Sequence, residues 1–282
     1  MVPGIQMVDS HPEWAVGDYR NEAIVYNCDH RAVALNNLYR GGTAFLVGSG
    51  PSLKDVDLSL FNTRGVLSMC MNNSVSVIRP QLWCSVDSPH RWVDQLWEDP
   101  GILKFLPLSH LGKKTRKRKG GVLVYSKPAD RYPSVFGYKL VHHFDHSTFL
   151  TSPSFSWGCE NTQTGSDGVK GHKSVFLVAI KLLYFLGVRT INLVGVDFNM
   201  SPENPYAFPE TKSAGGVRYN NTLYKVLTGR LELLKPSFDA AGLRIRNCSP
   251  VSKLGLFPKI TFEAAIKEVT LSDNINTEGF YH

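Results

Sequence analysis

Short apolar runs bounded by turn residues are the feature that most constrains the fold of this sequence. They lie at residues 43–48, 65–71, 81–87, 121–126, 190–198 and 243–249, with a further candidate at 139–144. The clearest of them lack the alternation of apolar and polar residues that a half-exposed strand shows. They are therefore typical of strands that are buried on both faces, as in a parallel sheet covered by helices.

Helical patterns fall between these runs, at 51–61, 172–187 and 221–242, and the last is expected to break before Pro236. Strands that alternate with helices predict an α/β fold, in which a mostly parallel sheet has helices on both faces. We expect a single main domain at 41–260, with a helical extension at 1–40 and a C-terminal tail at 261–282. An insertion is expected at about 92–160.

The charge of the chain indicates an anionic partner. Its 282 residues include 31 Lys and Arg against 24 Asp and Glu, a formal net charge of +7. Such an excess favours nucleotides, phosphorylated sugars or nucleic acid. Much of it lies in a basic loop expected at 112–121, whose cations are Lys113, Lys114, Arg116, Lys117, Arg118 and Lys119. This run is either a solvated loop or a patch that contacts the phosphates of a polymeric acceptor, and it contains no aromatic residue for base stacking.

Targeting and cysteine patterns narrow the class of protein further. No apolar run is long enough to span a membrane, and the first residues lack the pattern of a signal peptide, so we expect a cytoplasmic protein. The five cysteines are scattered and include no CxxC pair. This spacing predicts neither a zinc site nor a disulfide framework.

The segment Gly48-Ser49-Gly50-Pro51-Ser52 joins the first apolar run to a helical pattern. Glycine permits the close approach of a ligand to the backbone, and the first amides of a helix can hold an anion. The segment is therefore a candidate cradle for a phosphate or a ribose, although it matches neither the GxGxxG pattern nor a P-loop. The alternative interpretation is a tight turn between a strand and a helix.

Polar residues follow several of the other apolar runs. Asn72 and Asn73 could bond a base edge or a ribose hydroxyl, or could cap a turn. Asp87 and Asp197 could bond a ribose, hold a metal, take a proton as catalytic residues, or cap the next turn. Because ligands bind beyond the carboxyl ends of the strands in open parallel sheets, these residues are expected to gather at one edge.

Two loops complete the set of candidate site residues. The Gly-rich stretch at 164–174 precedes the strongest helical pattern, so Lys173 and Ser174 could meet an anion at the helix start and His172 could act as an acid or base. The long aromatic segment at 199–221 is typical of a lid, from which Tyr206 and Arg218 could reach a departing phosphate. Each loop could instead be an ordinary surface connection.

Taken in order, "LVGSGPSLKDVD", "MCMNN", "GHKSVFLVAIKLLYFLGVRTINLVGVDF" and "YAF" resemble two related groups of proteins. One is the bacterial lipooligosaccharide sialyltransferase family, and the other is the DUF115 group that contains archaeal 6-hydroxymethylpterin pyrophosphokinase. The resemblance spans roughly residues 43–250, apart from 92–159, and implies a Rossmann-like nucleotide-binding domain. The sialyltransferase pattern would place Gly48, Ser49, Gly50 and Asn72 at the nucleotide, Ser174 at the sugar and Tyr206 at the phosphate.

The sequence departs from the sialyltransferase pattern at three points. Ser49 and Asn199 stand where family members carry Asn and Tyr, and no histidine lies between His172 and His282 to match the catalytic histidine of the family. The base therefore has to be another group.

The resulting expectation is a glycosyltransferase that uses a CMP- or UDP-linked sugar donor. Its acceptor would be a glycan or, alternatively, a hydroxymethylated base in the DNA of a phage. One alternative is a pyrophosphokinase-like enzyme that uses ATP and magnesium, which Asp87 and Asp197 could hold. A third is a nucleic-acid-binding protein without catalysis. The metal requirement stays open, and no dedicated metal site is predicted.

Overall fold

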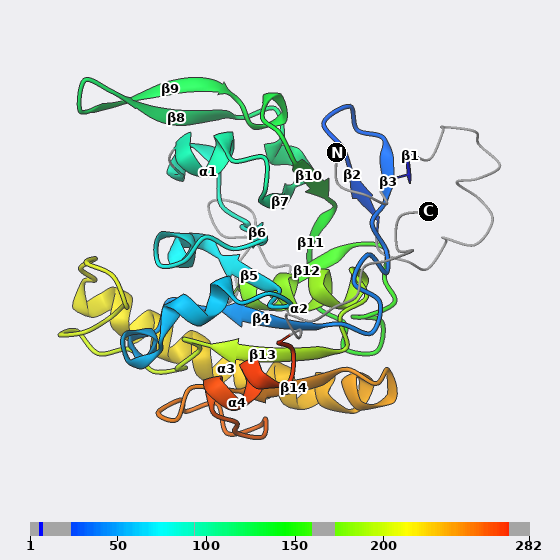
Figure 1. Ribbon diagram of the computed structural model, residues 1–282, viewed down its shortest axis with the longest axis vertical. Coiled ribbons are helices and arrows are strands. Elements are labelled where there is room, and N and C mark those ends of the chain that lie inside the picture. Colours follow the sequence, from blue (N-terminus) through cyan, green and yellow to red (C-terminus); the bar gives the residue numbers. More distant parts are fainter. Residues whose placement is uncertain (1–5, 8–23, 93, 160–172, 271–282) are drawn as a thin grey trace.

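The computed structural model describes residues 6–7, 24–92, 94–159 and 173–270, and a ten-stranded sheet forms the centre of this part (Figure 1). The strand order is β1-β3-β2-β10-β7-β6-β5-β4-β13-β14. The strands from β10 to β14 in this order run parallel, and the other three pair antiparallel at one edge. The expected mostly parallel α/β sheet is therefore confirmed.

The parallel strands are β4 (Thr43–Val47), β5 (Ser68–Met71), β6 (Leu82–Cys84), β7 (Leu103–Pro107), β10 (Val135–Tyr138), β13 (Thr190–Val194) and β14 (Arg244–Asn247). The antiparallel strands are β1 (Gln6–Met7), β2 (Val25–Tyr26) and β3 (Ala32–Ala34). Single turns of 3-10 helix connect several of them: η3 (Asn72–Ser76), η4 (Pro89–Arg91), η5 (Leu108–His110) and η6 (Ala129–Arg131).

Each face of the sheet carries its own apolar core. Ala44 and Leu46 of β4 pack in one cluster with α2 (Val175–Phe185) and α3 (Ala214–Ala240). Phe45 and Val47 pack in a second cluster on the other face. That second cluster takes in residues of η1 (Pro51–Asp55), η2 (Leu58–Asn62), α1 (Asp94–Glu98) and α4 (Phe262–Lys267). Since alternate residues of a strand point to opposite faces, burial on both sides explains why the strand is apolar throughout.

The segment expected as an insertion, 92–160, in fact supplies β7 and β10 to the central sheet. It also forms two small sheets, β8 (Lys114–Lys119) with β9 (Val122–Pro128), and β11 (Leu140–His143) with β12 (Phe155–Cys159). The apolar run at 121–126 therefore belongs to a hairpin and not to the buried sheet. Figure 1 shows this hairpin extending away from the rest of the molecule.

The two ends of the described chain also differ from the expectation. Residues 24–40 hold β2, β3 and turns instead of a helix, because Val25 and Val33 are buried at the edge of the sheet. In the expected tail, Thr261 caps α4, and Phe262 and Ile266 pack in the second cluster. Helix α3 begins at Ala214, inside the segment expected as a lid, and continues past Pro236 without ending.

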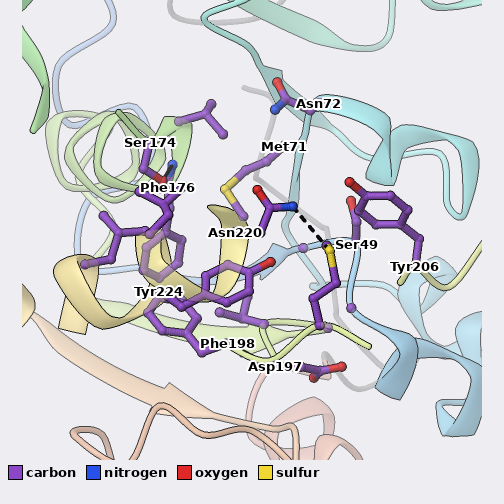
Figure 2. Close-up of a pocket in the computed structure, with 18 of the residues that line it drawn as sticks. Ser49, Met71, Asn72, Ser174, Phe176, Asp197, Phe198, Tyr206, Asn220 and Tyr224 are labelled. Carbon is purple, nitrogen blue, oxygen red and sulfur yellow. Dashed lines mark hydrogen bonds between the residues drawn. The ribbon is translucent and has the colours of Figure 1, made fainter. Parts of the chain in front are cut away.

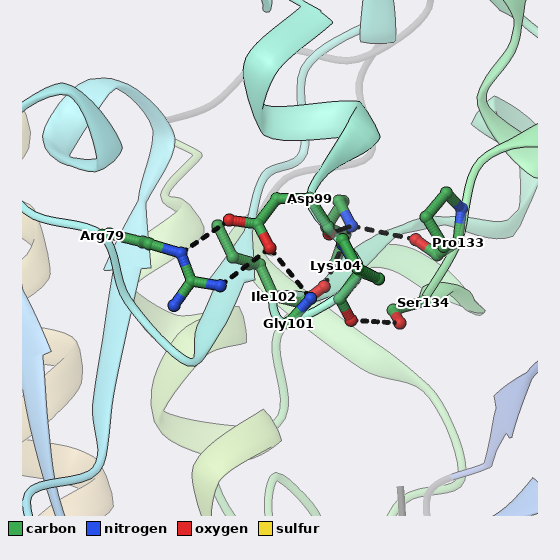
Figure 3. A network of polar contacts seen from close by, with 8 residues as sticks. Arg79, Asp99, Gly101, Ile102, Lys104, Pro133 and Ser134 are labelled. Atoms are coloured by element: carbon green, nitrogen blue, oxygen red, sulfur yellow. Dashed lines mark hydrogen bonds and ion pairs between the residues drawn. The ribbon is translucent and has the colours of Figure 1, made fainter. Parts of the chain in front are cut away.

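A buried lysine stabilises the connection into β7 (Figure 3). The Lys104 Nζ atom donates to the carbonyl oxygens of Asp99, Ile102 and Pro133 at 2.7, 3.0 and 2.9 Å. Burial lowers the pKa of Lys104 to about 8. The Arg79 guanidinium binds the Asp99 carboxylate through two hydrogen bonds of 2.6 and 2.8 Å. The backbone carbonyls of these loops have no partner within the sheet, and the Lys104 ammonium supplies their hydrogen bonds.

Candidate functional site

A cavity of about 400 Å³ lies at the carboxyl edge of the parallel sheet (Figure 2). It is bounded by the loops that follow β4, β5, β6 and β13 and by the first residues of α2. Strand β4 lies between β5, which follows it in sequence, and β13, which returns from far along the chain. The order of the strands reverses here, and ligands bind at such a reversal in open α/β sheets. The volume falls in the range of pockets that bind small-molecule ligands.

The cavity brings together most of the residues predicted for catalysis, for the nucleotide and for the leaving phosphate, and none of the predicted cations of the basic loop. Its lining includes Gly48, Ser49, Gly50, Asn72, Asp87, Lys173, Ser174, Asp197 and Tyr206. Pro51, Ser52, Asn73 and Arg218 are not among the lining residues. His172 lies outside the described residues.

The glycines after β4 are required by the protein's own backbone. A Cβ atom on Gly48 would lie 2.4 Å from the Gly195 carbonyl oxygen, and one on Gly50 would lie 2.5 Å from the Asp197 carboxylate. The amides of the two glycines donate to the carbonyls of Val194 and Gly195, each at 2.8 Å. The absence of a side chain at these positions is thus required by the loop after β13, and both glycines also line the cavity.

Asp197 joins three loops of this edge. Its carboxylate accepts hydrogen bonds from the Ser52 amide at 3.0 Å, from the Ser52 hydroxyl, and from the Ser249 hydroxyl at 2.6 Å. The residue as a whole is 6% exposed. The amide at the start of η1, expected to meet a phosphate, therefore binds a carboxylate of the same chain. This geometry makes Asp197 an organising residue of the edge.

Asp87 is the more accessible of the two predicted carboxylates. Its side chain is 34% exposed, and Oδ2 lies 3.2 Å from Nη1 of Arg91. Its amide donates to the Ser85 hydroxyl at 3.0 Å, and its carbonyl oxygen lies 3.1 Å from His110 Nδ1. Burial lowers the pKa of His110, and the nearby Lys113 acts in the same direction. The loop after β6 thus holds its backbone in place while the carboxylate stays available to solvent and to the cavity.

Asn72 and Asn73 point to different places. Asn72 has a left-handed backbone, with φ of 50°, which asparagine tolerates better than most residues. Its Oδ1 accepts from the Ser85 hydroxyl at 2.8 Å, so the Nδ2 group is oriented as a donor. Asn73 instead donates from Nδ2 to Glu210 at 3.1 Å. Asn72 therefore belongs to the cavity, whereas Asn73 holds the segment before α3.

The start of α2 opens into the cavity. Ser174 caps the helix by accepting a hydrogen bond from the Phe176 amide at 3.2 Å, and its own amide donates to the Trp157 carbonyl at 2.9 Å. The Lys173 ammonium lies 4.8 Å from the centre of the Trp157 ring. The partial positive charge of a helix start and the ammonium act together, so this wall attracts an anion.

A further part of the cavity lining, beside the start of α2, is aromatic and is not predicted from the sequence. Phe198 and Tyr224 stack with ring centres 5.1 Å apart, and Phe176 contacts Phe198 edge-on at 5.7 Å. Burial raises the pKa of Tyr224 to about 12. Figure 2 shows these rings together, with Asn220 projecting between them and Ser49. Tyr224 and Asn220 come from α3, whose face toward the cavity depends on tertiary packing.

The segment before α3 places Tyr206 at the cavity. Its ring stacks on Phe208 with centres 5.3 Å apart, and the Ala207 amide donates to the Ser49 carbonyl at 3.0 Å. Arg218 lies one turn into α3 and is exposed. Arg218 does not line the cavity, so its contact with a departing phosphate stays a prediction.

Groups of three metal-ligating side chains are absent from the part of the chain that the structure describes. The same part contains no helix long and apolar enough to cross a membrane.

The sequence matches no family model and no curated protein. Among solved structures it is similar to the sialyltransferase CstII from Campylobacter jejuni in complex with a substrate analogue, cytidine-5'-monophosphate. The identity is 13% and the TM-score 0.43, over 84% of this chain and 89% of that one. It is also similar to the MAf glycosyltransferase from Magnetospirillum magneticum AMB-1, with 14% identity and a TM-score of 0.44, over 89% of this chain and 39% of that one. Similarity of this extent does not assign an activity to this chain.

Proposed function

We propose that the cavity binds a nucleotide-sugar and that the protein transfers the sugar to an acceptor hydroxyl. The observation that carries the proposal is the meeting of three features at one reversal of strand order. They are the Asn72 amide donor, an anion-attracting helix start at Lys173 and Ser174, and a void of nucleotide size. A CMP- or UDP-linked donor has the base, ribose and phosphate that such a set would bind.

In this proposal the donor takes one orientation in the cavity. The nucleoside lies beside Ser49 and Asn72, where the Asn72 amide donates to an acceptor atom of the base or ribose. The phosphate lies at the start of α2, near Lys173 and Ser174. The Tyr206 hydroxyl, on the segment before α3, donates to the phosphate oxygen as negative charge develops there.

The reaction breaks the bond between the anomeric carbon of the sugar and the phosphate oxygen, and it forms a bond between that carbon and the acceptor oxygen. The nucleotide leaves with the bonding electron pair, and the acceptor hydroxyl loses its proton. Asp87 is the carboxylate that takes this proton, because it lines the cavity and stays 34% exposed. Asp197 positions the loops instead, since three hydrogen bonds occupy its oxygens.

Thermal unfolding in the presence of CMP, UDP, their sugar conjugates, or ATP with magnesium tests the donor class. We expect stabilisation by a pyrimidine nucleotide that does not require magnesium. Asn72→Asp keeps the acceptor for Ser85 but removes the amide donor and adds a negative charge, so we expect affinity to fall about tenfold or more. Asn62→Asp, an exposed position on η2, is the control with the same charge change. A shift caused only by ATP with magnesium would instead support the pyrophosphokinase alternative.

A further inference from the structure

The whole net charge of the protein is concentrated in one hairpin. Residues 112–128 contain seven cations and no acidic residue, so the rest of the sequence carries equal numbers of basic and acidic residues. The cations are Lys113, Lys114, Arg116, Lys117, Arg118, Lys119 and Lys127. Within the described residues none of them forms an ion pair. A dense charge that the protein leaves uncompensated is the electrostatic footprint of a polyanion-binding surface.

Strand pairing sorts these side chains onto two faces. Arg116 lies opposite Tyr125 and Arg118 opposite Leu123, and these four share one face of the hairpin. Lys117 and Lys119 lie opposite Val124 and Val122 on the other face. The Arg116 guanidinium is 5.2 Å from the centre of the Tyr125 ring, and Tyr125 as a residue is 61% exposed. The basic strand therefore acquires an aromatic partner from β9 that its own sequence lacks.

The arginine face leads back to the cavity through η4. His90 contacts the Tyr125 ring edge-on at 6.3 Å between ring centres. The next residue, Arg91, forms the 3.2 Å ion pair with Asp87, which lines the cavity. Contacts thus run without a gap from the cavity wall, over η4, to Tyr125 and Arg116. We use the name basic strip for His90, Arg91, Arg116, Arg118 and Tyr125.

We propose that the basic strip binds single-stranded nucleic acid and leads one nucleotide of the strand to the cavity. Arginines bind the phosphates, and the exposed Tyr125 ring offers a surface on which a base can stack. The proposal that the strand binds rests on the residues of the hairpin alone. The statement that the strand is the acceptor rests on the proposed sugar transfer. A single strand suits this path because its bases are already unpaired and need no extrusion from a duplex.

The arrangement of apolar residues argues against a membrane as the partner. Each exposed apolar side chain near the hairpin tip lies opposite a cation: Val122 opposite Lys119, and Leu123 opposite Arg118. The turn itself consists of Gly120 and Gly121, with φ of 57° and 82°. A tip of this composition cannot enter hydrocarbon without carrying charges into it, which is costly. A hydrated phosphate backbone meets the same cations without that cost.

Fluorescence anisotropy with the full chain and a labelled single strand of about 20 nucleotides, longer than a typical site, tests the inference. We expect Arg116→Ala with Arg118→Ala to weaken binding at least about tenfold and to reduce the salt slope by about 1.4, at about 0.7 for each phosphate that is no longer neutralised. Lys117→Ala with Lys119→Ala removes the same charge from the opposite face and should have a clearly smaller effect. Arg64→Ala with Lys267→Ala, two exposed positions outside the hairpin, should leave binding unchanged. Tyr125→Ala should weaken binding roughly tenfold, and Tyr125→Phe should not.

Three results would overturn the inference. These are absence of strand binding at low salt, equal losses from the arginine and lysine pairs, and binding only to vesicles of phosphatidylserine and phosphatidylcholine. Nucleotide affinity of the arginine double variant separates the two proposals. Loss of strand binding with intact nucleotide binding supports both, while strand binding without any nucleotide binding would remove the proposed transfer and leave the hairpin site.

Discussion

The cavity edge and the β8–β9 hairpin use polar residues in opposite ways. At the cavity edge, the glycine amides, Ser52 and the Asp197 carboxylate are bonded to one another across loops that are distant in sequence. On the hairpin, the cations have no acidic partner among the described residues. At the cavity edge these bonds hold the cavity open. On the hairpin the positive charge is not compensated by any described residue. Function is therefore inferred from shape in one region and from uncompensated charge in the other.

Removal of the Asp197 carboxylate should have the largest effect, because it would break the bonded edge itself. In Asp197→Ala the Ser52 amide and the hydroxyls of Ser52 and Ser249 lose a buried charged acceptor. We expect the free energy of unfolding to fall by about 4 kcal/mol, since each bond to a charged group contributes about 1.5–3 kcal/mol and the effects are not additive. Urea denaturation measures this change. A loss below about 1 kcal/mol would show that Asp197 does not organise the edge.

Loss of the carboxylate at Asp87 should reduce turnover and should leave folding unaffected. Asp87→Asn removes the proposed base while its backbone contacts with Ser85 and His110 remain. We expect sugar transfer to fall about 100-fold or more, as is typical for loss of a general base. Stability should change by less than about 0.5 kcal/mol because the side chain is partly exposed. Rate measurements with a saturating donor test this, and full activity of the variant would assign the base elsewhere.

Gly50 should tolerate no side chain, in contrast to a glycine remote from the edge. A Cβ atom at Gly50 would lie 2.5 Å from the Asp197 carboxylate, so we expect Gly50→Ala to destabilise the protein by about 1–3 kcal/mol. Gly229→Ala, on α3 with no atom within 4 Å, should stabilise it by about 0.5–1 kcal/mol. Thermal and urea unfolding measure the change in the free energy of unfolding for both variants. Equal effects at the two positions would contradict the tight packing described for the edge.

A buried lysine of the core offers a test through pH, and a contrast with the exposed lysines of the hairpin. Lys181 donates to the carbonyls of Ser152 and Ser154, and burial lowers its pKa to about 7. The unfolded chain therefore binds one more proton than the folded chain between about pH 7 and the ordinary pKa of lysine near 10.4. The free energy of unfolding should rise with pH in this window, by at most about 1.4 kcal/mol per unit from this group.

Lys181→Met should remove that contribution, which urea denaturation at pH 7 and pH 9 would measure against the parent chain. Lys117→Ala is the control, since its side chain is exposed on the hairpin. An unchanged pH dependence in Lys181→Met would mean that Lys181 stays protonated in the folded protein throughout this range.

The sequence predicts best those elements whose residues face only the core. Strands β4 and β13 and helix α2 were recognised because burial on both sides makes them apolar throughout. Strand β7 was missed because Lys104 and Pro107 interrupt its apolar pattern, although Lys104 is buried against loop carbonyls. Strand β8 was expected as a loop because its cations face solvent and its partner lies across a turn.

For the candidate site, the sequence predicts which residues follow strands but not what they contact. Asp87 and Asp197 occupy the same kind of position, yet the serines that bond Asp197 lie 145 and 52 residues away along the chain. The aromatic wall was missed because Tyr224 reaches the cavity only through the packing of α3. Such contacts depend on tertiary structure, which neither motif nor periodicity encodes locally.

A crystal structure of the protein soaked with CMP and, separately, with UDP tests the central claim most directly. We predict that a nucleotide lies at the carboxyl end of β4, with its base or ribose bonded to the Asn72 amide and its phosphate at the start of α2 near Ser174. A nucleotide bound elsewhere, or an empty cavity in crystals whose protein binds the same nucleotide in solution, would contradict the claim.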